Sequence, residues 1–335
     1  MANAINFNLF MANSITPTQP TSLVEKLGKE IPSKNVRIGE NIGDLIGSGA
    51  KRSIFTATWN GRTVAVKRYF IDTIPSCLKD EFDTHCKVDN EYIVKFHGIC
   101  AEPGNFFVVT DLMRMSLYDF QTKYSDINYV CCTAKYRFAL GIIRGLKYLH
   151  SLDILHRQIY DSNVFFGENG WGKLGNHGLL RLKNEANYHD NASPDMVRSK
   201  LRWRAPETFI RNYTATKAID IFALAMVLWQ MESRTKPFDK ISDENEDMII
   251  NAICANQLPK IEKRWAYAGI IRKCMKFNEE ERPSIEEMEQ NTINMDKTRL
   301  YCVFLKSEGL FSEGAMKDVY PLIFNILGKL LARHI

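Results

Sequence analysis

Residues 155–163 of the chain read LHRQIYDSN, and this short polar stretch decides how the rest of the sequence is interpreted. It follows the segment KYRFALGIIRGLKYLHSL (residues 135–152), whose apolar residues recur at helical spacing. A second polar stretch, KLGNHGL, follows at residues 173–179. Each stretch carries an uncharged amide, Gln158 in the first and Asn176 in the second. Because an amide has no useful basicity near neutral pH, neither side chain can act as a general base.

The composition is that of an ordinary soluble protein and argues against several specialised classes. Apolar residues make up 45% of the 335-residue chain, charged residues 25%, and the net charge of +5 is too mild to indicate a nucleic-acid partner. The eight cysteines form no C-x-x-C pair, which indicates neither a zinc site nor a disulfide framework. We therefore expect reduced thiols and a cytoplasmic protein, with the nucleus as the alternative. No apolar run reaches about 18 residues, so no transmembrane segment is expected.

Strand-like patterns come first along the chain, and helix-like patterns follow. Residues 1–38, rich in Asn, Thr, Ser and Pro, are expected to be a flexible leader. A helix is expected at 77–88, and runs with β-branched residues predict strands at 53–59, 63–70, 92–100 and 106–112. Helical spacing predicts later helices at 135–152, 218–233, 246–257, 265–277 and 284–293. The predicted fold class is α+β with two lobes: a small sheet lobe with one helix at 39–113, and a larger, mainly helical lobe at 114–290.

The remaining residues, 291–335, form a C-terminal extension that ends in the amphipathic pattern DVYPLIFNILGKLLARHI at 318–335. Its apolar face has three possible destinations: the protein's own surface, a partner protein, or a membrane surface. The membrane is the least favoured of these, because the polar face carries few charges.

Several ordered landmarks resemble the protein kinase family over about residues 40–290. In IGSGAKRSIFTATWNGRTVAVKRY, Gly47 and Gly49 match the first two glycines of the loop that covers the ATP phosphates, although Arg52 replaces the third. The resemblance implies that Lys67, in VAVK, is the lysine that pairs with the phosphates. It also implies that Glu81 is the helix glutamate that pairs with this lysine, and Asp80 is the alternative.

The resemblance also implies where adenine would bind. In VVTDLMRMSLYDF, Thr110 would stand at the back of the adenine pocket, while Asp111 to Met113 would present backbone groups to the adenine edge. The pocket would be lined by Ile54, Ala65 and Phe165.

The two quoted stretches match the family's catalytic loop and metal-binding motif, with their key acids replaced. Gln158 occupies the position of the aspartate that accepts the substrate proton, while Asn163 fits the metal-binding asparagine. Tyr160 stands where a kinase often has a lysine or arginine near the transferred phosphate, and Asp161 is an alternative base. Asn176 replaces the aspartate that binds Mg²⁺, an ion that prefers anionic oxygen. The resemblance thus implies a degraded metal site at Asn163 and Asn176, weak ATP binding, and no bound Mg²⁺.

Other landmarks match residues that support the family's fold rather than its chemistry. The motif RWRAPETF supplies Glu207, and the resemblance implies an ion pair between this residue and Arg282. Asp220 matches the buried aspartate that holds the catalytic-loop backbone. The amino-acid sequences of these motifs are similar to those of the tyrosine-kinase-like group. A column joining the lobes would contain His85, Phe96, His156 and His177, either buried with backbone hydrogen bonds or sensitive to pH.

Three functions are compatible with these patterns. The first is a pseudokinase that acts as a signalling scaffold or switch, whose partners are signalling proteins such as an active kinase or its substrate. Its adjustable surface would be segment 179–204, where phosphate on Tyr188, Ser193 or Ser199 would pair with Arg181, Arg198 or Arg202. The second is an active but atypical Ser/Thr or Tyr protein kinase. The third is a protein-binding module without a nucleotide role, which docks through residues 318–335.

Overall fold

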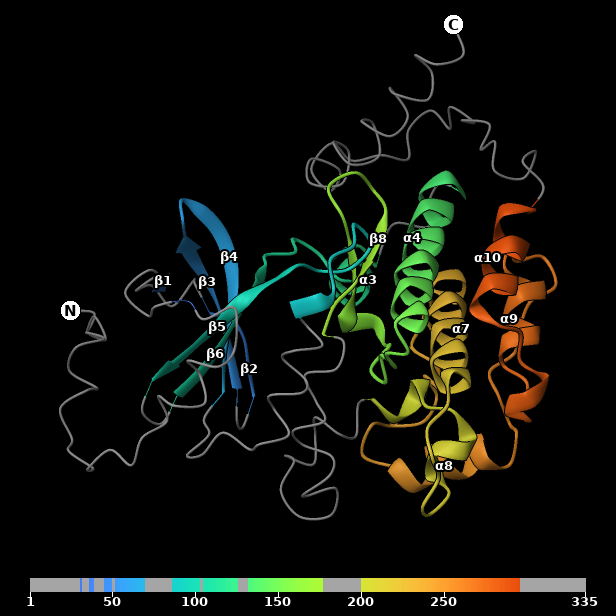
Figure 1. Cartoon of the computed structure of the whole chain (residues 1–335). Helices are drawn as coiled ribbons and strands as arrows, with labels where there is room; N and C mark the ends of the chain where they lie inside the picture. Colours follow the sequence, from blue (N-terminus) through green and yellow to red (C-terminus); the bar gives the residue numbers. More distant parts are fainter. Residues whose placement is uncertain are drawn as a thin grey trace, which may run out of the picture. The chain divides into compact units, whose positions relative to one another are not determined.

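The computed structural model describes a set of separate stretches of the chain: residue 31 and residues 36–38, 45–49, 52–69, 86–102, 105–125, 132–176 and 200–295. These fall into two compact units, with chain crossings after Asp89, Ile93 and Met113. The first unit contains an antiparallel sheet, and the second is mainly helical (Figure 1). The predicted α+β, two-lobed fold class is confirmed.

The sheet of the first unit has the strand order β1-β3-β4-β6-β5, with β2 also paired to β3. Its strands are β1 (Val36–Ile38), β2 (Leu45–Gly49), β3 (Arg52–Trp59), β4 (Arg62–Tyr69), β5 (Phe96–Glu102) and β6 (Asn105–Asp111). The β3–β4 turn consists of Asn60 and Gly61, both with positive φ, which is the chemistry that two-residue hairpin turns require. On one face, β-branched residues of β4 and β6 build a core that includes Val64, Val66 and Val109.

Two details of the sheet differ from the sequence prediction. The glycine-rich segment forms strand β2, in which Gly47 lies opposite Ile54, with a register shift just before it. Strand β5 begins at Phe96 rather than Tyr92, because Tyr92 and Ile93 belong to the second unit, where the Tyr92 carbonyl accepts the backbone N–H of Leu174 at 2.9 Å. Of the predicted helix at 77–88, Cys86 and Lys87 are helical and Val88 is not, while residues 77–85 lie outside the described residues.

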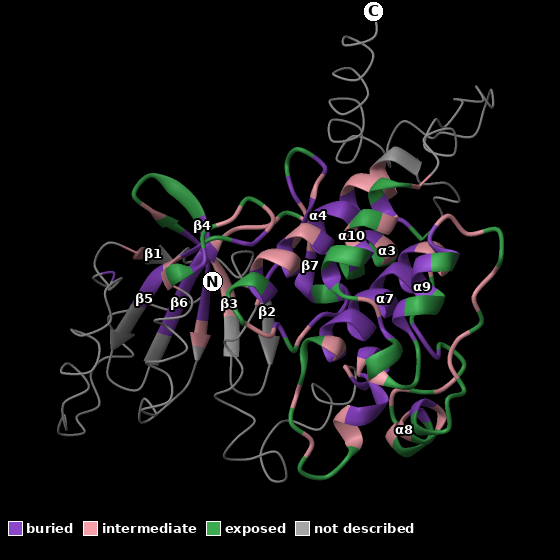
Figure 2. Ribbon diagram, turned by 45° about the vertical axis from the view of Figure 1, so that its right-hand side comes forward, coloured by how far each residue is buried: buried purple, intermediate pink, exposed green. Residues whose placement is uncertain are grey.

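The second unit is built around α7 (Lys217–Ser233), which is buried over most of its length (Figure 2). A helix that is apolar on nearly all sides belongs in a core, and here α4 (Cys132–Ser151) and α9 (Ala268–Cys274) pack beside it. The hairpin of β7 (Val164–Phe166) and β8 (Gly172–Leu174) lies against α4.

The remaining helices are short, and some of them begin with a side-chain cap. In α3 (Leu117–Lys123), Ser116 and Asp119 form a reciprocal capping box, and Ser284 caps α10 (Ile285–Ile293). The other short elements are α8 (Glu246–Cys254), η3 (Asp161–Asn163), η4 (Leu201–Trp203), η5 (Pro206–Phe209) and η6 (Glu279–Glu281). The helices predicted from residue 135 onward are all confirmed, with ends shifted by up to three residues. None of the helices in the described ranges is long and apolar enough to cross a membrane.

Candidate active site

The catalytic-loop stretch is anchored by one buried carboxylate. Asp220 of α7, 1% exposed, accepts the backbone N–H of His156 at 2.8 Å and that of Arg157 at 2.7 Å. The same carboxylate contacts Nε2 of His150 at 3.0 Å. These bonds hold Arg157 in a left-handed conformation with φ of 62°, which few non-glycine residues adopt. The predicted role of Asp220 is confirmed.

His156 itself is fully buried and uncharged at physiological pH. Burial lowers the pKa of its imidazole to about 4, although the nearby Asp220 carboxylate opposes this shift. Its Nδ1 accepts the backbone N–H of Gln158 at 3.2 Å. This favours the interpretation of His156 as a buried, hydrogen-bonded histidine over that of a sensor working near neutral pH. His85 and His177 of the predicted column lie outside the described residues.

A row of three amide residues, Gln158, Asn163 and Asn176, includes both positions at which an acid is replaced. The buried Asn163 donates from Nδ2 to the backbone carbonyl of Gln158 at 2.9 Å. Asn176 donates from its own Nδ2 to Oδ1 of Asn163. The oxygen that Asn163 would offer to a metal ion is therefore already used by a neighbouring amide. The structure brings these three predicted site residues together, with no carboxylate among them.

Asp161, the alternative base, is turned into the protein rather than toward the amide row. Its carboxylate, 4% exposed, accepts Nε2 of Gln230 at 3.0 Å and the hydroxyl of Ser162 at 3.1 Å. Burial raises its pKa, against the opposing effect of these hydrogen bonds. Because this carboxylate is buried and hydrogen-bonded, the geometry does not favour Asp161 as a substitute base.

Gln230 is a residue of this region that the sequence interpretation missed. It is 1% exposed in α7, and its Oε1 accepts Nε1 of Trp203 at 3.0 Å. Its Nε2 also donates to Oε1 of Gln121 at 2.7 Å. The only available signal was a glutamine within an otherwise apolar helical run, which does not identify its partners.

In the first unit, four predicted nucleotide-binding residues share one face of the sheet. Ile54 of β3 lies directly opposite Lys67 of β4, and Ala65 of β4 lies opposite Thr110 of β6. Directly paired residues in a sheet point to the same side, and so do residues two apart on one strand. Lys67 is buried, with 7% of the residue exposed.

The other predicted nucleotide-binding residues lie in several different elements. Gly47 lies opposite Ile54 in the same row, while Gly49 ends β2 opposite Arg52. Asp111 ends β6, and its carboxylate contacts Nε2 of His97 at 2.7 Å. Met113 ends the stretch Val94–Met113 of the first unit, and Phe165 lies in β7 of the second. Glu81 lies outside the described residues.

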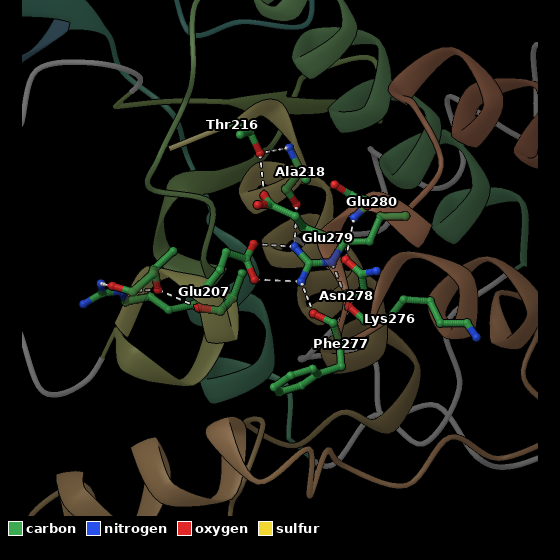
Figure 3. Close-up of polar contacts among 12 residues, drawn as sticks. Glu207, Thr216, Ala218, Lys276, Phe277, Asn278, Glu279 and Glu280 are labelled. Carbon is green, nitrogen blue, oxygen red and sulfur yellow. Dashed lines mark hydrogen bonds and ion pairs between the residues drawn. The ribbon is translucent and has the colours of Figure 1, made fainter. Parts of the chain in front are cut away.

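The fold-supporting ion pair predicted between Glu207 and Arg282 is present and buried. The guanidinium makes two parallel contacts with the carboxylate, at 2.5 and 2.8 Å. It also donates to three backbone carbonyls, those of Ala218, Lys276 and Phe277 (Figure 3). This bidentate geometry satisfies both charged groups in the interior, and the prediction is confirmed.

Arg202 has a different role from the one expected of it. We expected Arg202 to pair with a phosphate group. Its side chain is instead 2% exposed, and its guanidinium binds Asp243 at 2.6–2.8 Å. It also donates to the backbone carbonyls of Pro237, Phe238 and Ile241. Its donors are thus used in holding the loop after α7. Arg181 and Arg198, and the three candidate phosphorylation sites, lie outside the described residues.

Comparison with known proteins agrees with this geometry. A family model for the protein tyrosine and serine/threonine kinase domain matches residues 41–292, most of the chain. The chain belongs to the protein kinase superfamily. The match covers the strand that carries Lys67, the helix that carries Asp220, and Arg282, which follows η6.

Individual relatives are distant and are named as kinases. A Dictyostelium discoideum protein named "Probable serine/threonine-protein kinase drkD" is 29% identical over 81% of this chain and 21% of its own length. The serine/threonine-protein kinase TNNI3K of Mus musculus is 28% identical over 63% of the chain and 26% of its own length. The serine/threonine/tyrosine-protein kinase HT1 of Arabidopsis thaliana is 24% identical over 74% of the chain and 64% of its own length. TNNI3K and HT1 are members of the tyrosine-kinase-like group. The chain thus spans less than two thirds of the length of each of these relatives.

Proposed function

We propose that this kinase domain is a pseudokinase that serves as a signalling scaffold or switch and binds ATP weakly or not at all. The observation that carries the proposal is the amide row, in which Asn176 donates to the very oxygen of Asn163 that would face a metal ion. Gln158 completes the row in place of the base, and its own Oε1 is buried without a hydrogen-bond partner among the described residues.

The physical argument concerns charge. Mg²⁺ is a hard cation that binds carboxylates and phosphate oxygens, and here two neutral amides would have to replace a carboxylate–amide pair. Removing one charged catalytic group commonly lowers a rate by several orders of magnitude, and both losses affect the same step. The fold-supporting charges, by contrast, are retained in Asp220, Glu207 and Arg282. This pattern supports a domain that keeps the kinase fold for binding other proteins and does not catalyse phosphoryl transfer.

The first test is phosphoryl transfer from radiolabelled ATP to generic protein substrates. We expect the wild type to show no more transfer than Lys67→Ala, which lacks the phosphate-pairing lysine. Transfer that is clear in the wild type and lost in Lys67→Ala would overturn the proposal.

A thermal-shift titration with ATP, with and without Mg²⁺, tests the metal site separately. We expect a small or absent shift of the unfolding temperature that is the same in both conditions. The matched variant Asn176→Asp restores an anionic oxygen beside Asn163, and its shift should become dependent on Mg²⁺. A wild-type shift that already depends on Mg²⁺ would contradict the absence of a functional metal site.

An active but atypical protein kinase is the second candidate, and two observations favour it. The relatives are named as serine/threonine kinases, and Lys67 lies on the same face as Ile54, Ala65 and Thr110, as nucleotide binding would need. This candidate requires an unconventional base and metal mode, and the transfer assay distinguishes it from the first.

A protein-binding module without a nucleotide role is the third candidate. It would use residues 318–335, which lie outside the described residues. Deleting this segment should then abolish binding to its partner, an active kinase or a kinase substrate in the cytoplasm, while leaving the kinase domain folded. Partner binding that is unaffected by the deletion would exclude this candidate.

A further inference from the structure

Both faces of strand β4 are buried, although an antiparallel sheet commonly leaves one face to water. Ala65 and Lys67 point to the face described above and are each 7% exposed. Val64 and Val66 point to the opposite face and are at most 1% exposed. This opposite face, called the apolar face below, is formed by Ala57, Val64, Val66, Phe107 and Val109.

The apolar face is contacted by an isoleucine that precedes β1 by five positions in the sequence. Ile31 is 5% exposed and belongs to the same hydrophobic cluster as the residues of the apolar face. Its backbone N–H donates to the carbonyl of Ile99 in β5 at 2.7 Å. Strand β5 ends the strand order, and an edge strand is where an extended peptide can add its backbone to a sheet. Ile31 therefore combines the two contacts of a docked peptide, a backbone hydrogen bond to an edge strand and an apolar side chain on the sheet.

The apolar face is bordered by aromatic and polar groups. The half-buried Trp59 packs against the cluster, and its ring centroid lies 5.0 Å from that of His97. Nε2 of His97 contacts the carboxylate of Asp111 at 2.7 Å. Because this polar pair lies beside Trp59, the surface suits a short apolar group rather than a long apolar segment.

The sequence around Ile31 matches such a surface. In GKEIPSKN (residues 28–35), charged, polar and glycine residues flank the isoleucine, apart from Pro32 directly after it. A residue before proline favours an extended backbone, which is the conformation needed to reach an edge strand. The segment thus offers one branched aliphatic side chain in an otherwise polar context.

From these contacts we propose that the apolar face is a docking site for an extended segment with one branched aliphatic side chain, and that this chain fills the site with its own Ile31. The inference is independent of the amide row and of nucleotide, and it goes beyond the proposed function. One side chain and one backbone hydrogen bond form a weak contact by themselves, so occupancy depends on the high effective concentration that the covalent connection provides. A matching segment that is supplied as a separate molecule therefore competes with Ile31 for the site.

A peptide with the sequence of residues 26–35, KLGKEIPSKN, tests the proposal. Its binding to the full chain is measured by fluorescence anisotropy with the wild type and with Ile31→Ser, which leaves the site without its own anchor. The Kd should be at least about tenfold lower for Ile31→Ser than for the wild type. The control is the same peptide carrying Ile31→Ser, which keeps Leu27 and every charge, and it should bind the variant at least about tenfold more weakly.

Three outcomes overturn the proposal. Equal affinity of the peptide for the wild type and for folded Ile31→Ser would mean that it binds elsewhere. Absence of binding to folded Ile31→Ser would mean that Ile31 only packs as part of the fold. Equal binding of the two peptides to the variant would mean that the aliphatic side chain is not what the site recognises.

A second measurement keeps the proposal testable if Ile31→Ser does not fold. The thiol of Ile31→Cys is alkylated with iodoacetamide and followed by mass spectrometry, with Thr58→Cys as the control at an exposed position of β3. Alkylation should be at least about tenfold slower at position 31 than at position 58. Excess KLGKEIPSKN peptide should speed it about two- to fivefold at position 31 and leave position 58 unchanged. Equal rates at the two positions, or a rate at position 31 that the peptide does not change, would reject the docking site.

Discussion

Two regions of the second unit, both built from polar side chains, differ in their charge. The ion pair of Glu207 and Arg282 and the carboxylate of Asp220 keep full charges in the interior, each with several hydrogen-bond partners. The amide row of Gln158, Asn163 and Asn176 is uncharged, and its neutral hydrogen bonds join Asn176 to Asn163 and Asn163 to the backbone carbonyl of Gln158. Among the described residues of these two regions, charged groups hold backbone segments together in the first, and the three site residues of the second are neutral amides.

This comparison predicts that the two regions respond very differently to substitution. Removing one partner of a buried ion pair leaves the other charge without compensation, whereas removing one member of an amide pair costs only a neutral hydrogen bond. Measurements of stability therefore separate the two regions without requiring any knowledge of substrate or partner.

The largest effect on stability is expected for Arg282→Ala, which leaves the buried carboxylate of Glu207 without its charged partner. We expect the free energy of unfolding to fall by about 3–5 kcal/mol. Chemical denaturation measures this value, and Lys217→Ala serves as a control because its ion pair with Asp153 is largely exposed, so its loss should change stability far less. A loss below about 1 kcal/mol for Arg282→Ala would remove the contrast between the two regions.

The second effect concerns His156, which lies between the two regions. Its pKa of about 4 in the folded state is below the unfolded value of 6.5, so the unfolded chain binds more protons between these values. Stability should therefore be unaffected by this group above pH 6.5 and should fall by about 3 kcal/mol as the pH drops from 6.5 to 4.

The pH prediction is checked by denaturation curves measured across this range. His156→Phe, which removes the titrating group, should show a flatter pH dependence than the wild type, whatever its stability at neutral pH. Parallel curves for the two proteins would mean that His156 does not titrate with a lowered pKa.

The third effect tests the packing of α4 on the hairpin that leads to Asn176. A Cβ on Gly141 would lie 2.4 Å from the carbonyl oxygen of Gly172, so Gly141→Ala must displace backbone. We expect a loss of about 1–3 kcal/mol in the free energy of unfolding. Gly269→Ala is the matched control: its Cβ would meet nothing within 4 Å, and alanine favours a helix by up to about 1 kcal/mol. The same sign of change in both variants would contradict this account.

The elements of the fold and the contacts of the site could be predicted where the sequence carries a local pattern or a known motif for them. Helical periodicity located the later helices, and motif resemblance identified Asp220, Glu207 and Arg282 together with their partners. The hydrogen bond from Gln230 to Asp161 was missed, because these residues are 69 positions apart and no motif connects them. The expectation for Arg202 failed for a similar reason, since three of its acceptors are the backbone carbonyls of Pro237, Phe238 and Ile241, which carry no sequence signal. The strand β2 was missed because glycines are depleted in strands.

The smallest effect is expected in the amide row itself. Asn176→Ala removes the donor to Asn163 and leaves one neutral acceptor without that partner, so the free energy of unfolding should fall by about 1 kcal/mol. Asn176→Asp replaces the donor by a carboxylate facing Oδ1 of Asn163, and without metal it should be at least as destabilised. Adding Mg²⁺ with ATP should recover stability in Asn176→Asp and leave Asn176→Ala unchanged. Equal recovery in both variants would mean that Mg²⁺ binds through other groups, and that the amide row is not what keeps the metal out.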